Sequence, residues 1–347
     1  MQNIYGLSLS ELTALLPAGV PAFRAKQIVD WMYRKYVSSF DEMSNLSKVL
    51  REQLAECFSI EKPVLVSEWN SSDGETTKYL LAFADGEAVE TVLMRHDYGN
   101  SVCVSTQVGC AMGCAFCAST LHGVKRDLTA GEMLSEVLYI NEQLTKNGQK
   151  VDTLVLMGSG EPLMNYDNVL AFIRLLHEEY TLNLGYRNVT LSSSGIVPQI
   201  HRLAEEGLPI NLSISLHAAD DETRSELMPV NRKYPIAEVL AAADYYAGQT
   251  KRRITYEYIL IDKKNDRQID ADRLSGLLKG KLANVNLIPI NPVAERNLNR
   301  PSVKRINEFK QVLEAHHISV TLRREMGTDI QAACGQLRNK HLHCEDM

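Results

Sequence analysis

The chain has 347 residues, of which 45% are hydrophobic, so it is long enough for one large domain with smaller attachments or for two domains. Its longest apolar runs are interrupted by polar residues and fall short of the ~20 residues that a membrane-spanning helix needs. The N-terminal sequence lacks the basic and apolar regions of a secretory signal, and seven clustered cysteines, an odd number, do not form a disulfide framework. We therefore expect a cytoplasmic protein that crosses no membrane.

The net charge of −6, from 37 basic and 43 acidic residues, argues at first against a nucleic-acid partner, because Lys and Arg make the phosphate contacts. A folded surface can nevertheless gather basic residues on one side. Such residues are bunched at Arg24/Lys26, Arg34/Lys35, Lys125/Arg126, Lys251/Arg252/Arg253, Lys304/Arg305, Arg323/Arg324 and Arg338/Lys340. Each bunch alone more often marks a solvated face than a binding site.

Residues 1–60 have the pattern of a small helical accessory domain. Ser8 with Glu11 three residues later is a capping-box pattern, and apolar residues recur at helical spacing over residues 23–36. A further helix fits residues 46–58. The middle segment also has a basic face, which is either a binding surface or the solvated side of a plain amphipathic helix.

From residue 61 to 99 the apolar period changes to two. Alternating runs flank Asp85-Gly86, which is a strong signal for a β-hairpin, so we predict a hairpin that leads into the main domain. Glu90 lies in the second arm beside Val89 and Val92. By alternation alone it could be a solvent-facing strand residue, which is the usual position of a glutamate.

From residue 100 to 347 predicted strands alternate with helical stretches. The strands fall near residues 102–105, 153–157, 188–192, 210–216, 254–261, 285–290 and 318–322. This alternation predicts a parallel sheet in an α/β fold, and polar motifs come just after the strand ends, where α/β barrels have their sites. The pattern alone does not separate a barrel from a doubly wound sheet.

Cys110, Cys114 and Cys117 form a C-x3-C-x2-C run. Three close thiolates indicate a metal centre, and mere packing of buried cysteines is the minor alternative. A structural zinc site uses four protein ligands, and no fourth ligand lies nearby in the sequence. A four-iron cluster held by three thiolates leaves one iron open to a substrate, so the spacing favours a cluster over zinc.

This cysteine run, with Phe116 before its last cysteine, resembles the radical S-adenosylmethionine (SAM) superfamily. Five further motifs resemble the RlmN/Cfr family of RNA adenine methyltransferases: M-G-S-G-E-P-L-M-N from Met157, L-S-S-S-G from Leu191, S-L-H-A from Ser215, N-P at Asn291 and D-I-Q-A-A-C-G-Q-L from Asp329. The resemblance covers nearly the whole chain. It implies a partial, open (β/α)6 radical SAM barrel over residues 100–347, one [4Fe-4S] cluster on the three cysteines, and two SAM molecules per turnover.

The resemblance assigns SAM contacts to residues that follow predicted strands: Gly160, Glu161, Ser192, Ser215, Leu216, His217 and Asn291. Glycine lets the backbone approach a ligand closely, and polar members of the set offer carboxylate, hydroxyl, imidazole and amide groups. Ser159 departs from the methionine that the family motif has at its place.

Two lone cysteines match essential cysteines of the family: Cys334 carries a methyl group, and Cys103 releases the product by attack on the Cys334 sulfur. The atom that the family methylates, C2 of adenine, is an electron-poor carbon that bears hydrogen. It cannot attack the methyl group of SAM, so a radical route is required. Glu90 matches a proton acceptor of the family, although Cys103 is also a candidate for removal of the C2 proton. Cys57 and Cys344 match nothing.

The RlmN branch implies methylation of C2 of adenosine 2503 in 23S rRNA and of adenosine 37 in tRNAs. It also implies an electron donor such as flavodoxin or ferredoxin, and we expect a monomer. Pro162 favours this branch, because Cfr enzymes tend to have alanine there and methylate C8 of the same rRNA adenosine. A zinc-stabilised RNA-binding protein without catalysis is the alternative from another class.

Overall fold

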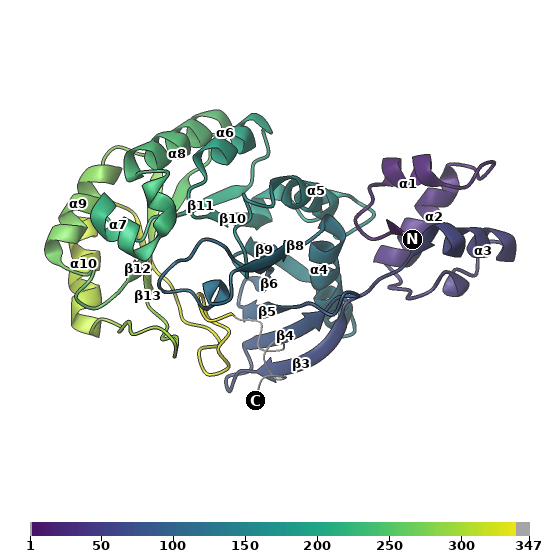
Figure 1. Ribbon diagram of the computed structural model, residues 1–347, viewed down its shortest axis with the longest axis horizontal. Helices are drawn as coiled ribbons and strands as arrows, with labels where there is room; N and C mark the ends of the chain where they lie inside the picture. Colours follow the sequence, from purple (N-terminus) through teal and green to yellow (C-terminus); the bar gives the residue numbers. More distant parts are fainter. Residues whose placement is uncertain (1, 338–347) are drawn as a thin grey trace.

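The computed structural model describes residues 2–337, and its centre is a ten-stranded sheet in the order β14-β13-β12-β11-β10-β9-β6-β5-β4-β3 (Figure 1). One side of this sheet consists of parallel strands: β6 (Gly99–Cys103), β9 (Val151–Leu156), β10 (Val189–Ser193), β11 (Asn211–Ser215), β12 (Ile254–Leu260), β13 (Ala283–Pro289) and β14 (Val320–Leu322). Each lies within a few residues of a predicted strand. The predicted parallel sheet is confirmed.

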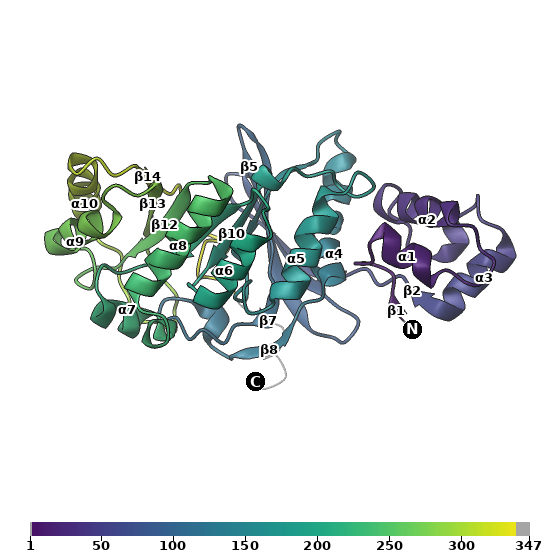
Figure 2. The ribbon, with the colours of Figure 1, turned by 90° about the horizontal axis from the view of Figure 1, so that it is seen from above.

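Helices cover the outer face of the curved sheet (Figures 1 and 2): α4 (Ala130–Thr145), α5 (Tyr166–His177), α6 (Val197–Glu205), α7 (Asp221–Leu227), α8 (Ile236–Thr250), α9 (Gln268–Leu278) and α10 (Val303–Ala315). A doubly wound sheet has helices on both faces, whereas loops occupy the inner side here. β14 and β3 are the two edges of the sheet and do not pair, so the barrel is open. The partial, open barrel is therefore confirmed over the doubly wound alternative.

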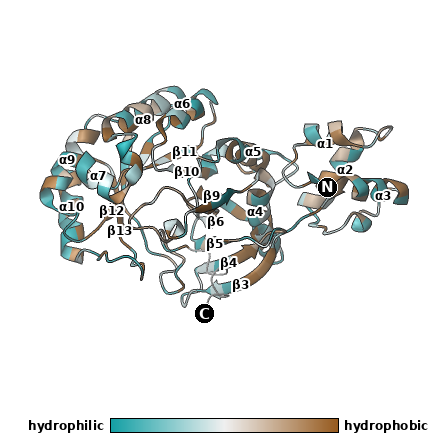
Figure 3. Ribbon diagram, in the orientation of Figure 1, coloured by the Kyte–Doolittle hydropathy of each residue, from teal (hydrophilic) through white to brown (hydrophobic). Residues whose placement is uncertain are grey.

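The core lies between the sheet and its outer helices, in one continuous cluster of buried apolar side chains. Leu154, Leu191 and Leu212 of adjacent strands are fully buried, and Figure 3 shows hydrophobic residues concentrated along strands such as β9. Phe172 and Leu176 of α5 recur at helical spacing on its buried side. Burying one such side chain contributes roughly 1.5–3 kcal/mol. Among the described helices, none is long and apolar enough to cross a membrane.

Antiparallel strands extend the sheet beyond β6: β3 (Val64–Asn70), β4 (Thr76–Ala82) and β5 (Ala88–His96). β4 and β5 form the predicted hairpin around Asp85-Gly86, where Gly86 has a φ of 85°, a conformation that glycine adopts without strain. β3 is an edge strand that the alternation of residues does not identify. Because β5 pairs with β6, hairpin and barrel share one sheet, and the division into residues 61–99 and 100–347 stays a prediction.

The N-terminal lobe, residues 2–59, lies beside α4 and α5 (Figure 2). It contains α1 (Leu9–Leu15), α2 (Phe23–Tyr33), the 3-10 turn η1 (Phe40–Glu42), α3 (Lys48–Cys57) and the parallel pair β1 (Gln2–Asn3) and β2 (Phe58–Ser59). The predicted capping box is present: Ser8 N–H donates to the Glu11 carboxylate at 2.8 Å, and Glu11 N–H donates to Ser8 Oγ at 3.3 Å. Leu9 N–H donates to Tyr180 Oη at 3.1 Å and so joins the lobe to the barrel.

Several basic bunches face acidic neighbours. Arg34 and Lys35 lie 3.7 and 3.9 Å from the Asp30 carboxylate, and Arg126 pairs with Glu132 at 2.8 Å. The exposed Asp30 pairs contribute little to stability, and all of these pairs offset part of the positive charge that we considered for a binding surface. The bunch at residues 338–340 lies outside the described part of the chain.

Candidate active site

The cysteine loop, residues 107–127, connects β6 to α4. It contains the antiparallel pair β7 (Gln107–Gly109) and β8 (Val124–Asp127) and the 3-10 turn η2 (Ala118–Thr120). Gly109 has a φ of 78°, and a Cβ there would overlap the carbonyl oxygen of Gly123. Only glycine allows this close approach. Cys110 N–H donates to the same carbonyl at 3.0 Å, which fixes the first cysteine at the start of the loop.

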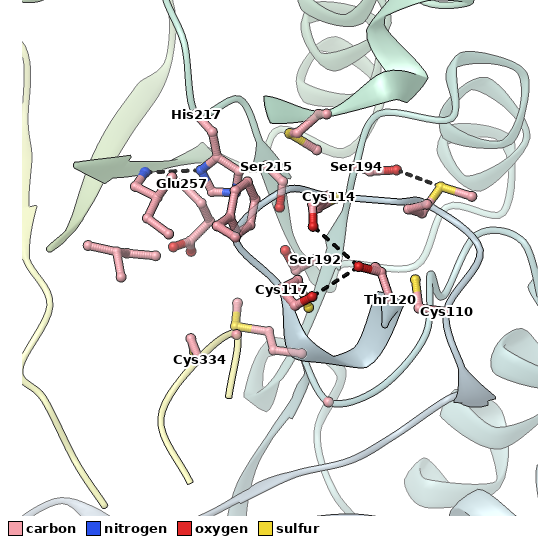
Figure 4. Close-up of a pocket in the computed structure, with 18 of the residues that line it drawn as sticks. Cys110, Cys114, Cys117, Thr120, Ser192, Ser194, Ser215, His217, Glu257 and Cys334 are labelled. Atoms are coloured by element: carbon pink, nitrogen blue, oxygen red, sulfur yellow. Dashed lines mark hydrogen bonds between the residues drawn. The ribbon is translucent and has the colours of Figure 1, made fainter. Parts of the chain in front are cut away.

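Hydrogen bonds fold the cysteine loop on itself and attach it to the C-terminal segment. Thr120 Oγ1 donates to the carbonyl of Cys117 at 2.9 Å and to that of Cys114 at 3.3 Å (Figure 4). Ala118 N–H donates to the carbonyl of Gly335 at 2.8 Å. Two segments that are far apart in the sequence are therefore held side by side.

The three thiols of the loop are buried or half-buried. Burial raises the pKa of Cys110 to about 12 and also raises the pKa values of Cys114 and Cys117. Cys110 and Cys114 are only 7% and 8% exposed. The thiols are therefore protonated until a metal displaces their protons, because thiolate is the form that binds metal.

The spacing of these thiols bears on the kind of metal centre. Within residues 2–337 no group of three His, Cys, Asp or Glu side chains lies close enough together to hold one metal ion. A single zinc ion requires its ligands to converge at about 2.0–2.3 Å from one point. A four-iron cluster takes each thiolate on a different iron, so its ligands need no common point. The assignment of Cys110, Cys114 and Cys117 as cluster ligands stays a prediction.

The three cysteines line a pocket at the carboxyl ends of the central strands, which we call the cysteine pocket (Figure 4). It holds about 850 Å³ of empty space, a volume that includes open solvent at its mouth. Four of the predicted SAM contacts line it: Gly160, Ser192, Ser215 and His217. They are brought together because the carboxyl ends of neighbouring parallel strands meet at one edge of the sheet.

Gly160 and Glu161 differ in their relation to this pocket. Gly160 lines it with a φ of 109°, and a Cβ would lie 2.6 Å from Thr106 Oγ1. The Glu161 carboxylate accepts N–H bonds from Leu163 at 3.0 Å and from Ser194 at 2.7 Å, and it does not line the pocket. Burial raises the pKa of Glu161. This carboxylate fastens the loops after β9 and β10 to each other, a role that the sequence did not indicate.

His217 is a buried, neutral imidazole in the pocket wall. Its Nδ1 accepts the N–H of Ile259 at 3.0 Å, which leaves the ring hydrogen on Nε2, and its ring lies edge-on to Phe116 with centroids 4.8 Å apart. Burial lowers the pKa of His217 to about 3. The neighbouring Leu216 is fully buried and does not line the pocket. His217 can therefore offer an N–H donor to a ligand, whereas the Leu216 side chain belongs to the core.

Arg224 of α7 is a buried cation that sequence reasoning missed. Its guanidinium donates to the carbonyls of Ser194 at 2.7 Å, Ser215 at 3.1 Å and Leu216 at 3.1 Å. Burial lowers the pKa of Arg224 to about 10, so it stays charged at neutral pH. It fixes the strand ends that line the cysteine pocket, and a single arginine in a polar helix gives no sequence pattern that reveals this role.

A second pocket adjoins the first, and we call it the two-cysteine pocket because Cys103 and Cys334 both line it. It holds about 1480 Å³ of empty space including its mouth. Cys334 also lines the cysteine pocket, so it is accessible from two sides. Cys57 is exposed, and Cys344 lies outside the described residues.

Asn291 lines the two-cysteine pocket and holds the Cys334 segment. Its Nδ2 donates to the Cys334 carbonyl at 3.2 Å, while its buried Oδ1 has no hydrogen-bond partner among the described residues. A buried acceptor without a partner costs about 1–3 kcal/mol. An amino group on a bound ligand, such as the one on the adenine of SAM, would satisfy this oxygen, so the residues present fit that cofactor.

Arg323 lines both pockets, although in the sequence it groups with Arg324 as a surface pair. Its Nη1 lies 3.8 Å from the Glu257 carboxylate, and its side chain is three-quarters buried. Negative charge at Cys334, Glu257 and Cys103 raises the pKa of Arg323, against the opposing effect of burial. A fixed cation therefore lies beside the two lone cysteines, and only the tertiary structure separates it from its exposed neighbour.

Glu90 is buried, which contradicts the solvent-facing alternative that alternation alone allowed. Its carboxylate lies 2.9 Å from Lys78 Nζ, and both side chains are almost fully buried. Lys78 also donates to the carbonyl of Gln331 at 3.2 Å. Glu90 lines neither pocket, although Val92, two residues on, lines the two-cysteine pocket and pairs in register with Cys103. The alternation of residues gave the wrong exposure for Glu90 because the C-terminal segment that contains Gln331 covers this face of the sheet.

An open parallel barrel with a three-cysteine loop at the carboxyl ends of its strands defines a radical SAM enzyme. The family model of the radical SAM superfamily matches residues 104–274, which include the cysteine loop and most of the cysteine pocket. A second model, the ribosomal RNA large subunit methyltransferase N-terminal domain, matches residues 2–60.

Individual relatives agree with these models. The chain is 54% identical to the probable dual-specificity RNA methyltransferase RlmN of Symbiobacterium thermophilum, over 98% of this chain and 92% of that protein. It is 50% identical to the protein of the same name from Clostridium perfringens, over 99% and 98%. A crystal structure of a radical SAM methyltransferase from Sphaerobacter thermophilus matches with a TM-score of 0.94 at 47% identity, covering 98% of this chain and 100% of that one. The chain belongs to the RlmN family.

This membership makes the chain a radical SAM methyltransferase, a class that uses an iron–sulfur cluster and SAM. The resemblance predicted from the motifs is confirmed. The alternative of a zinc-stabilised binding protein without catalysis is wrong.

Proposed function

We propose that this enzyme methylates C2 of adenine in RNA, at adenosine 2503 of 23S rRNA and at adenosine 37 of tRNAs, through a methyl group carried on Cys334. An RNA substrate is supported by the relatives, which are named dual-specificity RNA methyltransferases. The RlmN name of these relatives, together with Pro162, favours C2 over the Cfr-type C8 reaction. A radical route suits C2 because this carbon is electron-poor and does not attack the methyl group of SAM.

The cofactors in this proposal are one [4Fe-4S] cluster on Cys110, Cys114 and Cys117 and SAM in the cysteine pocket. When bound, they supply a radical that removes a hydrogen atom, and a second SAM molecule per turnover supplies the methyl group. The residues that would hold SAM are Gly160, Ser192, Ser215 and His217 in the pocket wall. The resemblance adds Asn291, whose unpaired Oδ1 lies at the adjoining two-cysteine pocket, and Glu161 and Leu216, which do not line the cysteine pocket.

The observation that carries the proposal is that Cys334 lines both pockets. A methyl carrier must be reached first from the SAM side and then from the substrate side. A residue in the wall that the pockets share meets both demands without a large movement. Asn291 holds the Cys334 carbonyl, and the cysteine loop holds the carbonyl of Gly335, so the carrier is positioned from both sides.

Cys103 is suited to release the product. Once the methylene carbon on Cys334 is joined to C2, one electron would return to the cluster and the C2 hydrogen would leave as a proton. A Cys103 thiolate would then attack the Cys334 sulfur, so that the S–S bond forms as the C–S bond breaks. The freed carbon takes up a proton, which completes the methyl group on the base. Burial raises the pKa of Cys103 to about 12, although Arg323 acts in the opposite direction. Cys103 is therefore a neutral thiol at rest, and its thiolate must form during the reaction.

The C2 hydrogen leaves as a proton, for which Cys103 and Glu90 are the candidates. Cys103 lines the pocket in which the base would bind, whereas Glu90 is paired with Lys78 and lines neither pocket. Cys103 could accept this proton only as a thiolate, so its own proton must leave before this step. Electrons would come from a donor such as flavodoxin or ferredoxin, and the enzyme would act as a monomer in the cytoplasm.

Variants of Cys334 and Cys103 test the mechanism. The two cysteines act in successive steps, so their variants should stop the reaction at different points. Cys334→Ala has no methyl carrier, so it should bind SAM and RNA but form neither product nor adduct. Cys103→Ala should complete the addition and then stall as a covalent RNA–protein complex through Cys334. This complex is measured as a shifted protein band on denaturing gels that collapses on nuclease treatment. Exposed Cys57→Ala is the matched control and should turn over normally.

Mass spectrometry of RNA treated with the reconstituted enzyme, SAM and a reductant reads the regiochemistry. We expect 2-methyladenosine, whereas 8-methyladenosine would assign the Cfr-type reaction. Normal turnover by Cys103→Ala, or a crosslink that maps to another residue, would rule out the two-cysteine mechanism.

A further inference from the structure

His96, the last residue of β5, and Tyr98, in the turn before β6, carry stacked aromatic rings. His96 pairs with Gly99, so only Asp97 and Tyr98 lie between the strands. The Tyr98 side chain is 72% exposed, and its ring stacks on the His96 ring at a centroid distance of 4.6 Å and an interplanar angle of 11°. An aromatic side chain so exposed buries little surface and contributes little to stability.

This stacked pair lies at the two-cysteine pocket. His96 and Tyr98 both line it, as do Met94 and Val92 on the same strand. Val92, Met94 and His96 alternate along β5, so they share one face, and Val92 is the register partner of Cys103. A continuous wall therefore runs from the reactive cysteine to the exposed tyrosine.

The distance between Cys103 and Tyr98 along this wall is too long for one base to contact both residues. Gly99 and Cys103, the two ends of β6, are four residues apart, which at about 3.3 Å per residue spans about 13 Å, and Tyr98 precedes Gly99 in the turn. That is longer than one purine base. A base whose C2 reaches the cysteines cannot also stack on Tyr98, so the pair would contact a neighbouring nucleotide of the same strand.

The charges around the pair suit an uncharged flat ring better than a phosphate. Arg324 lines the same rim but pairs with Glu75 at 2.6 Å, Glu325 pairs with Arg300, and Asp97 adds negative charge to the lining. Burial and the positive charge of Arg324 lower the pKa of His96, so its ring is neutral at pH 7. Two stacked neutral rings present a π-face, the feature on which unpaired bases stack.

We propose that Tyr98, supported by His96, is a stacking platform for an unpaired base that flanks the target adenosine. The platform rests on the proposed RNA substrate and deepens it. It holds the strand at the mouth of the two-cysteine pocket while the target base is turned inward. Because stacking accepts any base, one platform serves the different sequences around the rRNA and tRNA targets.

RNA binding by Tyr98 variants of the reconstituted enzyme tests the platform. The probe is a stem-loop that contains the target adenosine, with fluorescent 2-aminopurine at each flanking position in turn. In one flanking position wild type should quench this fluorescence, since stacking quenches it. Tyr98→Ala should lose the quenching and bind about five- to tenfold more weakly, and Tyr98→Phe should keep both. The salt dependence of binding should stay unchanged, because no phosphate contact is lost.

Tyr245→Ala is the matched control, because Tyr245 is exposed on the outer helix α8, and it should bind like wild type. Unaltered affinity and quenching in Tyr98→Ala would overturn the platform, and so would loss of binding in Tyr98→Phe, which would indicate a hydroxyl contact instead. The proposed function is judged separately. If wild type forms methyladenosine while Tyr98→Ala binds RNA normally, only the platform fails, and if wild type forms none, the proposed function fails.

Discussion

At the scale of the residue, His217 is a titratable group whose neutral form the fold requires. It accepts a backbone N–H from Ile259 through Nδ1 and lies against Phe116. A proton on Nδ1 would remove that acceptor and leave a charge in a buried wall. Burial accordingly lowers the pKa of His217 from 6.5 to about 3, which couples the stability of the pocket wall to pH.

We predict a loss of stability on mild acidification that depends on His217. Above pH 6.5 both folded and unfolded states hold a neutral imidazole, so the full stability is present. Between pH 6.5 and 3 the unfolded state binds a proton that the folded state does not, so stability falls as pH falls. From pH 7.5 to 5.5 this one group should cost about 1.4 kcal/mol.

Urea unfolding of wild type and His217→Gln at both pH values measures the effect. Carboxyl groups whose pKa values burial raises, such as Glu161 and Glu257, shift stability the other way, but they are present in both proteins. The difference between the two pH dependences isolates His217. Identical dependences would contradict the prediction.

At the scale of the element, Lys78 joins the β4–β5 hairpin to the segment that carries Cys334. Its ammonium lies between the Glu90 carboxylate and the carbonyl of Gln331, and Gln331 has a φ of 54°, which is uncommon for a side-chain-bearing residue. The ion pair therefore holds a strained turn against the sheet. This explains why a charged pair occupies a position where apolar residues would pack.

Lys78→Met should destabilise the protein by about 3–5 kcal/mol, because the Glu90 carboxylate loses its ammonium partner in a buried site. The double variant Lys78→Met/Glu90→Met should recover most of this loss, since no buried charge remains. Urea unfolding measures both, and limited proteolysis of residues 323–337 should be faster in both, because the bond to Gln331 is absent. A double variant as unstable as the single one would show that the ion pair is not the cause.

At the scale of the whole molecule, the N-terminal lobe is held against the barrel at a contact of two glycines. A Cβ at Gly6 would lie 2.5 Å from the backbone nitrogen of Gly131, and a Cβ at Gly131 would overlap the carbonyl oxygen of Tyr5. Tyr36 Oη accepts from Asn141 Nδ2 at 2.7 Å nearby. The lobe therefore approaches helix α4 through backbone, and its placement depends on the absence of side chains.

Gly131→Ala should destabilise the protein by about 1–3 kcal/mol through overpacking and weaken RNA binding if the lobe contributes to it. Gly276→Ala is the matched control, because Gly276 is also helical but has open space at its Cβ, so alanine should be neutral or stabilise by up to about 1 kcal/mol. Thermal unfolding compares the two. Equal melting temperatures would show that the lobe adjusts to the added methyl group.

The sequence alone determined the strands of the parallel sheet, the hairpin at Asp85-Gly86, the capping box of Ser8 and Glu11, and the family through its ordered motifs. These features depend on local periodicity, turn chemistry and residue spacing, which neighbours along the chain specify. The tertiary structure decided that Cys334 is shared by two pockets, that Arg323 lies beside it, and that Glu90 is buried against Lys78. Such contacts join segments that the sheet order brings together, and no local pattern encodes which distant side chain will cover a given face.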